Sequence, residues 1–247
     1  DDPYKYCDVN RAKTEIFTNE NRLFAREVAS QSMVLLKNEN QLLPLKRTGT
    51  IAVVGPLANT KENMAGTWSV ATEQNRSIAF LEGIKNVAGD KVKILYAKGS
   101  NLTYDAELEK RATMFGKEIN RDNRSDVELL NEALEIASEA DVIVAAIGES
   151  AEFNGESSSR TNIEIPQVQK DLLKALLNTG KPVVLVLFTG RPLVLKEESK
   201  TVPAILNVWF PGSEAGLAIS DVLFGDVNPS GKLTATFPQN VGQVPVF

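Results

Sequence analysis

The apolar residues of this chain gather in short runs that are separated by amphipathic stretches. Five runs of six to eight residues are nearly continuous in aliphatic and β-branched side chains. Such runs are typical of strands that are buried on both faces, as in a parallel sheet. The runs are Thr50–Gly55, Val92–Ala97, Asp141–Gly148, Pro182–Phe188 and Ala204–Trp209. They predict a sheet of mostly parallel strands.

The stretches between the runs carry helix signals, namely caps, apolar residues at helical spacing and glycine stops. The first predicted helix is 21–37, with Leu23, Phe24, Val28, Val34 and Leu35 as buried anchors; the second is capped by Ser125 in a capping box with Glu128 and buries Val127, Leu130, Leu134 and Ala137; the third begins at Pro166, buries Val168, Leu172, Leu173, Leu176 and Leu177 and ends at Gly180; the fourth is capped by Ser213 and ends at Gly225.

Alternating strands and helices predict an α/β fold: a doubly wound, mostly parallel sheet flanked by helices, or α/β sandwich. Residues 1–20 are polar and are predicted to be an interdomain linker, with the sandwich domain over 21–247. Residues 100–124 are charged without a strand pattern, which predicts a surface excursion. The start, Asp1-Asp2-Pro3, predicts a piece cut from a longer chain.

Composition removes several classes of function. The 247 residues include no histidine, which excludes a Ser-His-Asp triad, a Cys-His pair and a histidine-ligated metal built within this chain. Cys7 is the single cysteine, so no internal disulfide can form. The net charge of −5 argues against nucleic acid and anionic membrane surfaces as partners, and no apolar run is long enough to span a membrane. We predict no metal and no cofactor.

The connection after the third predicted strand is the strongest candidate site. It runs from Glu149 to Ile165, which is 17 residues where about 2–6 are usual for such connections. It carries four carboxylates and one arginine: Glu149, Glu152, Glu156, Glu164 and Arg160. A carboxylate presented into a cleft is suited to general acid catalysis, but the spacing equally fits a solvated acidic loop without a role.

Other motifs are weaker. Trp68, on the long connection after the first strand, can stack on a sugar ring or simply pack on the surface, and the sequence does not choose. The Gly-Glu-Ser triplets at 148 and 155 do not complete a G-x-S-x-G elbow, which argues against an esterase. Trp209 is predicted to be core, and Asp226 to make a turn.

Several stretches together resemble a known family. They are Leu35-Leu36-Lys37-Asn38, Ile51–Pro56, Gly190-Arg191-Pro192, Trp209–Gly216, Phe224–Leu233 and Thr236-Phe237-Pro238. This set resembles the C-terminal α/β sandwich domain of family 3 glycoside hydrolases, of the bacterial periplasmic β-glucosidase type. The resemblance covers residues 35–238.

The resemblance implies a retaining glycosidase that removes terminal β-D-glucosyl or xylosyl residues from an oligosaccharide or β-glucoside. Its nucleophile is an Asp on an N-terminal barrel domain, and no segment here matches that motif. The acid/base is a Glu on a sandwich loop that reads like GE…HE-x-SSR…IP. Here the loop reads Gly148-Glu149…Gly155-Glu156-Ser157-Ser158-Ser159-Arg160…Ile165-Pro166.

These matches imply that Glu156 is the acid/base, that Trp68 lines the sugar site and that Arg160 orients the loop or binds substrate. Gly155 stands where close relatives often have His. The resemblance further implies a periplasmic or secreted protein whose isolated sandwich chain is inactive without the missing barrel domain. The alternative is a non-catalytic carbohydrate- or protein-binding α/β module.

Overall fold

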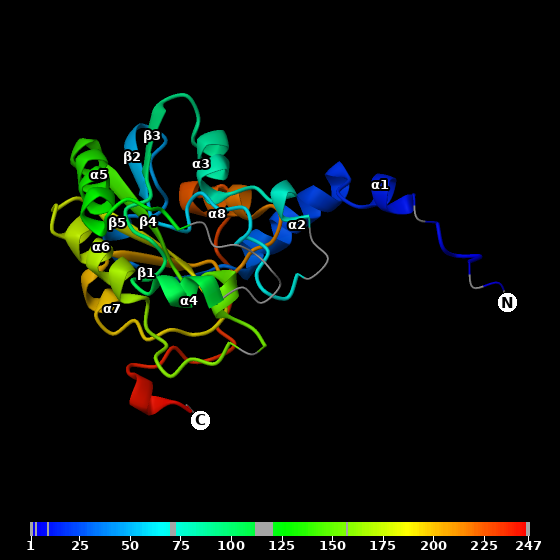
Figure 1. Ribbon diagram of the computed structural model, residues 1–247. Coiled ribbons are helices and arrows are strands. Elements are labelled where there is room, and N and C mark those ends of the chain that lie inside the picture. Colours follow the sequence, from blue (N-terminus) through cyan, green and yellow to red (C-terminus); the bar gives the residue numbers. More distant parts are fainter. Residues whose placement is uncertain are drawn as a thin grey trace.

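The fold is a three-layer sandwich with one sheet between two layers of helices (Figure 1). The computed structural model describes residues 2, 4–8, 10–69, 73–111, 121–156 and 158–245. The strands are β1 (Val34–Asn38), β2 (Gly49–Val54), β3 (Val92–Ala97), β4 (Val142–Gly148), β5 (Val183–Phe188) and β6 (Ala204–Asn207). The helices are α1 (Arg11–Glu15), α2 (Asn19–Ser32), α3 (Phe80–Ala88), α4 (Ala106–Arg111), α5 (Asp126–Glu139), α6 (Gln167–Leu177), α7 (Glu198–Thr201) and α8 (Ala215–Phe224).

The sheet is doubly wound, which confirms the predicted fold class. Its order is β1-β6-β5-β4-β2-β3, with β1 antiparallel to β6 and the remaining pairs parallel. The chain leaves β2 toward one edge and β4 toward the other, so the winding direction reverses between these neighbours. In open α/β sheets, this reversal leaves a crevice beyond the carboxyl ends of the two strands.

Two apolar cores cover the two faces of the sheet. One core packs α2, α3 and α8 against one face, and the other packs α5, α6 and the segment around α7 against the opposite face (Figure 1). Every residue of β5 is buried, which is why its sequence is an unbroken apolar run. The five predicted strands are confirmed, although β6 ends at Asn207, and Trp209 beyond it is only half-buried against Phe237.

The predicted helix over 21–37 is confirmed up to Ser32 and wrong beyond it. Helix α2 ends at Ser32, Met33 is extended, and Val34–Asn38 forms β1, an edge strand whose identity depends on pairing with the distant β6. Its supposed apolar anchors Leu23 and Phe24 are each 66% exposed.

Two ion pairs contribute to how α2 packs on α8. Arg22 Nε donates to Glu214 Oε1 at 2.7 Å, and Arg26 Nη2 to Asp221 Oδ1 at 2.5 Å. Both carboxylates are buried, and their pairing raises the pKa of each arginine. Helix α2 therefore contacts the rest of the domain with arginines and small residues, and not with the predicted apolar stripe.

The other helices differ from prediction in detail. The capping box of Ser125 and Glu128 is present, yet α5 buries Leu129, Ala133 and Ala137, while Val127 is exposed. Pro166 and Glu214 occupy the caps of α6 and α8, so Pro166 precedes the first turn and Ser213 is not the cap. Of the predicted surface excursion, 112–120 lies outside the described residues, while Ser100, Asn101 and Glu109 are buried.

Within the part of the chain that the structure describes, we find no helix with the length and apolar character needed to cross a membrane. Helix α1 lies on the N-terminal segment, away from the sheet (Figure 1).

Helices α3 and α8 approach so closely that glycine is required where they touch. A Cβ on Gly83 would lie 2.0 Å from the backbone of Gly216. We therefore expect Gly83→Ala to lower the free energy of unfolding by about 1–3 kcal/mol or more through overpacking. Helix propensity alone predicts the opposite sign, a gain of about 1 kcal/mol. Urea denaturation followed by circular dichroism measures the difference.

The control is Gly180→Ala, where a Cβ meets nothing within 4 Å but φ is +74°. Gly180→Ala should lower the free energy of unfolding by about 1–2 kcal/mol, because alanine is strained in the left-handed backbone conformation, although its Cβ meets no neighbouring atom. A Gly83→Ala protein that is as stable as the unaltered protein, or more stable, would contradict the packing argument.

Candidate functional site

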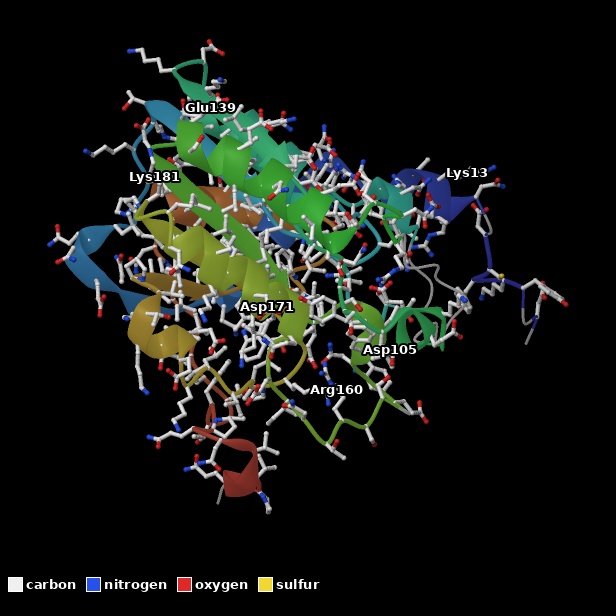
Figure 2. All side chains as sticks on the ribbon, turned by 60° about the vertical axis from the view of Figure 1, so that its left-hand side comes forward. Lys13, Asp105, Glu139, Arg160, Asp171 and Lys181 are labelled. Atoms are coloured by element: carbon white, nitrogen blue, oxygen red, sulfur yellow. The ribbon has the colours of Figure 1, made fainter. Side chains whose placement is uncertain are left out.

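The site candidates lie at the carboxyl end of the sheet. Figure 2 shows Arg160 at the end of the domain opposite Glu139 and Lys181, which precede β4 and β5. The loop from Glu149 to Ile165 leaves β4 at this end. Its first residue, Glu149, lies beside the end of β5, where the backbone N–H of Glu149 donates a hydrogen bond to the carbonyl of Phe188 at 2.8 Å. The strand-end location is the usual one for sites on this architecture.

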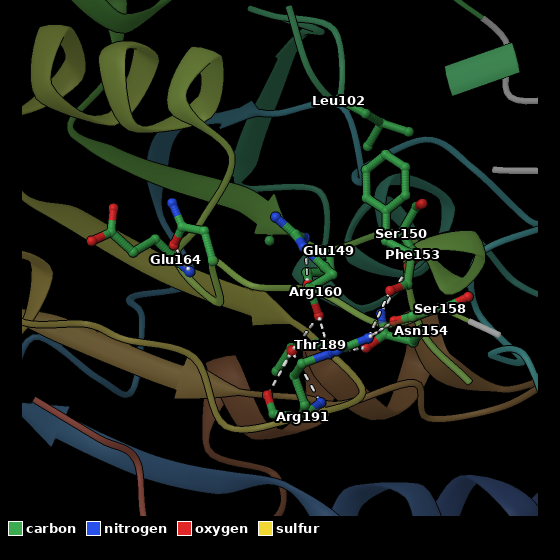
Figure 3. A network of polar contacts seen from close by, with 12 residues as sticks. Leu102, Glu149, Ser150, Phe153, Asn154, Ser158, Arg160, Glu164, Thr189 and Arg191 are labelled. Carbon is green, nitrogen blue, oxygen red and sulfur yellow. Dashed lines mark hydrogen bonds and ion pairs between the residues drawn. The ribbon is translucent and has the colours of Figure 1, made fainter. Parts of the chain in front are cut away.

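The loop is anchored by one buried carboxylate (Figure 3). Glu149 is fully buried, and its Oε1 accepts a hydrogen bond from Arg160 Nη1 at 2.5 Å. Its Oε2 lies 3.2 Å from Arg191 Nε and 3.3 Å from the hydroxyl of Thr189. A buried carboxylate needs such partners, because an unpaired one is strongly destabilising. The pair to Arg160 thus fixes the far part of the loop to its beginning.

Arg191 holds the loop on both sides of Glu156. Its Nη2 donates to the carbonyl of Phe153 at 2.7 Å and to the carbonyl of Ser158 at 3.2 Å. Its Nε donates to Asn154 Oδ1 at 3.0 Å. The planar guanidinium has donors in fixed directions, so one side chain sets the separation between the two flanks of Glu156.

A second contact joins this loop to the connection after β2. The hydroxyl of Thr67 donates to the carbonyl oxygens of Ala151 and Asn154, the latter at 2.9 Å. Gly155 has φ +95°, and a Cβ there would lie 2.5 Å from Thr67 Cγ2. Gly155 is therefore required both by backbone conformation and by the methyl group beside it.

This contact joins the two loops that carry the predicted site residues Trp68 and Glu156. Trp68 follows Thr67, Glu156 follows Gly155, and both side chains are exposed, Trp68 to 70%. Arg160 instead turns inward to Glu149, with its guanidinium 5.8 Å from the Phe153 ring, and is 24% exposed.

The four carboxylates of the loop have different surroundings. Glu149 and Glu152 are buried, and Glu164 is half-buried with Lys170 Nζ 2.9 Å away. Glu156 is the one exposed carboxylate in the described part of this loop. It is thus the group best placed to exchange a proton with a bound molecule.

Sequence reasoning missed the residues that shape the site, namely Arg191, Thr67 and Asn154. Arg191 lies in the Gly190-Arg191-Pro192 stretch, whose role was not apparent from the sequence. Their partners lie more than 30 positions away for Arg191 and more than 80 for Thr67, so local patterns carry no sign of these contacts.

Among the described residues, His, Cys, Asp and Glu form no group of three that could hold a metal ion. The predicted turn residue Asp226 lies just beyond the C-terminal end of α8 and pairs with Arg47.

The sequence profile described as Glycosyl hydrolase family 3 C-terminal domain matches residues 33–247. A periplasmic beta-glucosidase of Salmonella typhimurium is 50% identical, across 100% of this chain and 32% of its own length. A beta-xylosidase of Formosa agariphila is 37% identical, across 96% of this chain and 31% of its own.

Solved structures agree. The beta-glucosidase of Listeria innocua, crystallised as a D270A mutant with laminaribiose, superposes with a TM-score of 0.81 at 36% identity, over 100% of this chain and 30% of that one. The beta-glucosidase of Bifidobacterium adolescentis gives 0.76 at 29% identity, over 96% and 33%. The chain spans about a third of the length of these relatives.

We expect Arg191→Lys to loosen the loop, because one ammonium nitrogen cannot replace both the Nη2 contacts to the carbonyls of Phe153 and Ser158 and the Nε contact to Asn154. Amide hydrogen exchange over 154–163 should accelerate, and the free energy of unfolding should fall by about 1–3 kcal/mol. Arg124→Lys is the control, since Arg124 makes comparable contacts to Asp122 and Glu132 on the surface. Unchanged exchange in the loop would show that Arg191 does not hold it.

Proposed function

Since the chain belongs to family 3 of the glycosyl hydrolases, as its C-terminal domain, we propose that it supplies the general acid/base of a retaining β-glucosidase. In this proposal Glu156 is that acid/base, and the Asp nucleophile lies on an N-terminal barrel domain of the same protein. The substrate is an oligosaccharide or β-glucoside with a terminal β-D-glucosyl or xylosyl residue. The two sugars are those named for the relatives.

The single observation that carries the proposal is the position of Glu156. It is the exposed carboxylate of a loop whose two flanks are tied to Arg191 and whose neighbour Gly155 is packed against Thr67. A proton donor that serves another domain must reach outward and yet be held in place, because general acid catalysis depends on the donor's distance to the leaving oxygen.

The chemistry needs two carboxyl groups about 5–5.5 Å apart. Glu156 protonates the glycosidic oxygen while the Asp carboxylate attacks the anomeric carbon, so the glycosidic bond breaks, the leaving group departs as an alcohol and a covalent glycosyl-enzyme forms. Glu156, now a carboxylate, then removes a proton from water as the water attacks the same carbon, which breaks the bond to the Asp and releases the sugar. The proton balance closes over the two steps, and neither step calls for histidine, which this chain lacks.

Trp68 and Arg160 take supporting roles in the proposal. The exposed Trp68 ring offers an apolar face for a sugar ring beside Glu156. Arg160 holds Glu149 through Nη1, and its exposed part remains available to substrate hydroxyls.

The proposal extends to organisation and location. Residues 21–247 form the sandwich domain, 1–20 link it to the barrel, and the protein is periplasmic or secreted, as the name of the Salmonella relative suggests for that protein. The 247-residue chain alone is then inactive, because it provides a proton donor and no nucleophile.

The test is Glu156→Ala in the full-length protein that carries this domain, assayed on a β-linked disaccharide and on an aryl β-glucoside with a good leaving group. We expect the disaccharide rate to fall by about 10²–10⁴-fold and the activated substrate to lose less, because its leaving group needs little protonation. Azide should restore turnover and yield a β-glycosyl azide.

Glu164→Ala is the matched control, since it removes another carboxylate from the same loop and should keep both rates. Unchanged rates for Glu156→Ala would reject the assignment and direct the search to Glu152 and Glu149. Absence of any glycosidase activity in the unaltered protein would favour the alternative, a non-catalytic binding module.

Trp68→Ala should raise KM for the disaccharide about tenfold, the equivalent of one stacking contact, with a smaller change in kcat. Trp68→Phe should recover most of the loss because it keeps an aromatic face. Equal KM values for all three proteins would remove Trp68 from the sugar site.

A further inference from the structure

A cavity of about 170 Å³ opens at the carboxyl ends of β2, β3 and β4. It lies where the winding of the sheet reverses, between the connection after β2 and the start of the loop after β4. Its walls come from separate stretches of chain, among them Leu57, Asn63, Tyr96, Lys98 and Ser150. Small ligands bind preferentially at this reversal in open α/β sheets.

Two buried polar groups of the wall have no partner within the described part of the structure. They are the hydroxyl of Ser150, a residue 4% exposed, and the amide nitrogen of Asn63, a residue 5% exposed. The orientation of the Asn63 amide is set, because its oxygen accepts the N–H of Ala151 at 2.5 Å. Buried polar groups are nearly always hydrogen-bonded, so these two indicate a polar occupant of the cavity.

The charges of the wall argue against an anion. Glu62, Glu109 and Glu152 contribute carboxylates, and Glu109 is neutralised by Arg121 Nη1 at 2.7 Å. Among the described residues of the wall, these carboxylates face one ammonium, that of Lys98, whose pKa burial lowers. An excess of carboxylates repels an anion, while the donors and acceptors of the wall suit a neutral ligand with many hydroxyl groups.

Tyr96 completes this chemistry. Burial raises its pKa to about 12, so the phenol stays protonated and can both donate and accept. Its ring adds an apolar surface beside the amides and carboxylates of the wall. Such a combination matches the alternation of hydroxyl groups and C–H faces on a sugar ring.

The volume is suited to a small ligand. With about 30 Å³ for each water, the cavity has room for about six waters, which is comparable to the space of one pyranose ring.

We propose that this cavity binds one neutral monosaccharide, with the Ser150 hydroxyl and the Asn63 amide nitrogen as hydrogen-bonding partners. The proposal concerns binding by the 247-residue chain and requires no turnover, so it is tested separately from the role of Glu156.

The experiment is a titration of the ¹⁵N-labelled 247-residue chain with glucose, followed by amide chemical shifts. Saturable shifts should centre on Asn63, Lys98 and Ser150. Ser150→Ala should raise the Kd about three- to tenfold, the effect of one lost hydrogen bond. Ser77→Ala is the matched control, because Ser77 is also buried, its hydroxyl also lacks a described partner, and it does not line the cavity.

The outcomes that overturn the proposal are distinct. One is the absence of saturable shifts with glucose at on the order of 0.1 M, a hundredfold above a millimolar Kd; the cavity then holds water. Another is equal weakening by Ser150→Ala and Ser77→Ala. A third is binding that Trp68→Ala removes and Ser150→Ala leaves intact. Saturable binding of inorganic phosphate in place of glucose would contradict the neutral ligand, and tighter binding of a β-linked trisaccharide than of glucose would contradict the single ring.

Discussion

The buried carboxylate of Glu149 is the interaction on which the arrangement of the site depends. A fully buried negative charge cannot be left without partners, and the structure supplies Arg160 from the far part of the loop and Arg191 from the segment after β5. Each arginine is thereby held at a definite place, and each in turn orders chain that lies outside the strands and α-helices. The exposed position of Glu156 is a result of this inward pairing.

The sheet makes that pairing possible because it places strand ends side by side. Glu149 and Thr189 directly follow the adjacent, parallel β4 and β5, so the loops that leave these strands start next to one another. Gln169 on α6 reinforces the point of departure, with its amide bonded to both the N–H and the carbonyl of Gly148 at 2.8 and 3.0 Å. Strand β4 is thus held in place up to its last residue, Gly148, and the loop that carries the proposed chemistry begins at the next residue.

How far the sequence predicts this structure depends on the range of the interactions. The strands buried on both faces can be predicted from their apolar runs. The capping box can be predicted because its partners, Ser125 and Glu128, are three residues apart. Strand β1 was hidden, since Val34–Asn38 continues an apolar pattern from α2 and becomes a strand only by pairing with β6. The Glu156 loop stood out through its length and its resemblance to a family motif. Arg191 and Thr67 did not, because their roles consist of contacts with residues far along the chain.

Because Gly155 packs against Thr67, the residue that is tolerated at one of these positions depends on the residue at the other. A side chain at 155 needs the space that the Thr67 methyl fills, and it also needs a backbone that leaves the left-handed region. Histidine at position 155 of this chain would therefore need a smaller residue at position 67 or a differently shaped loop. Introduced by itself, it would displace the Thr67 side chain and disturb the support of Glu156, so the two positions can change only together.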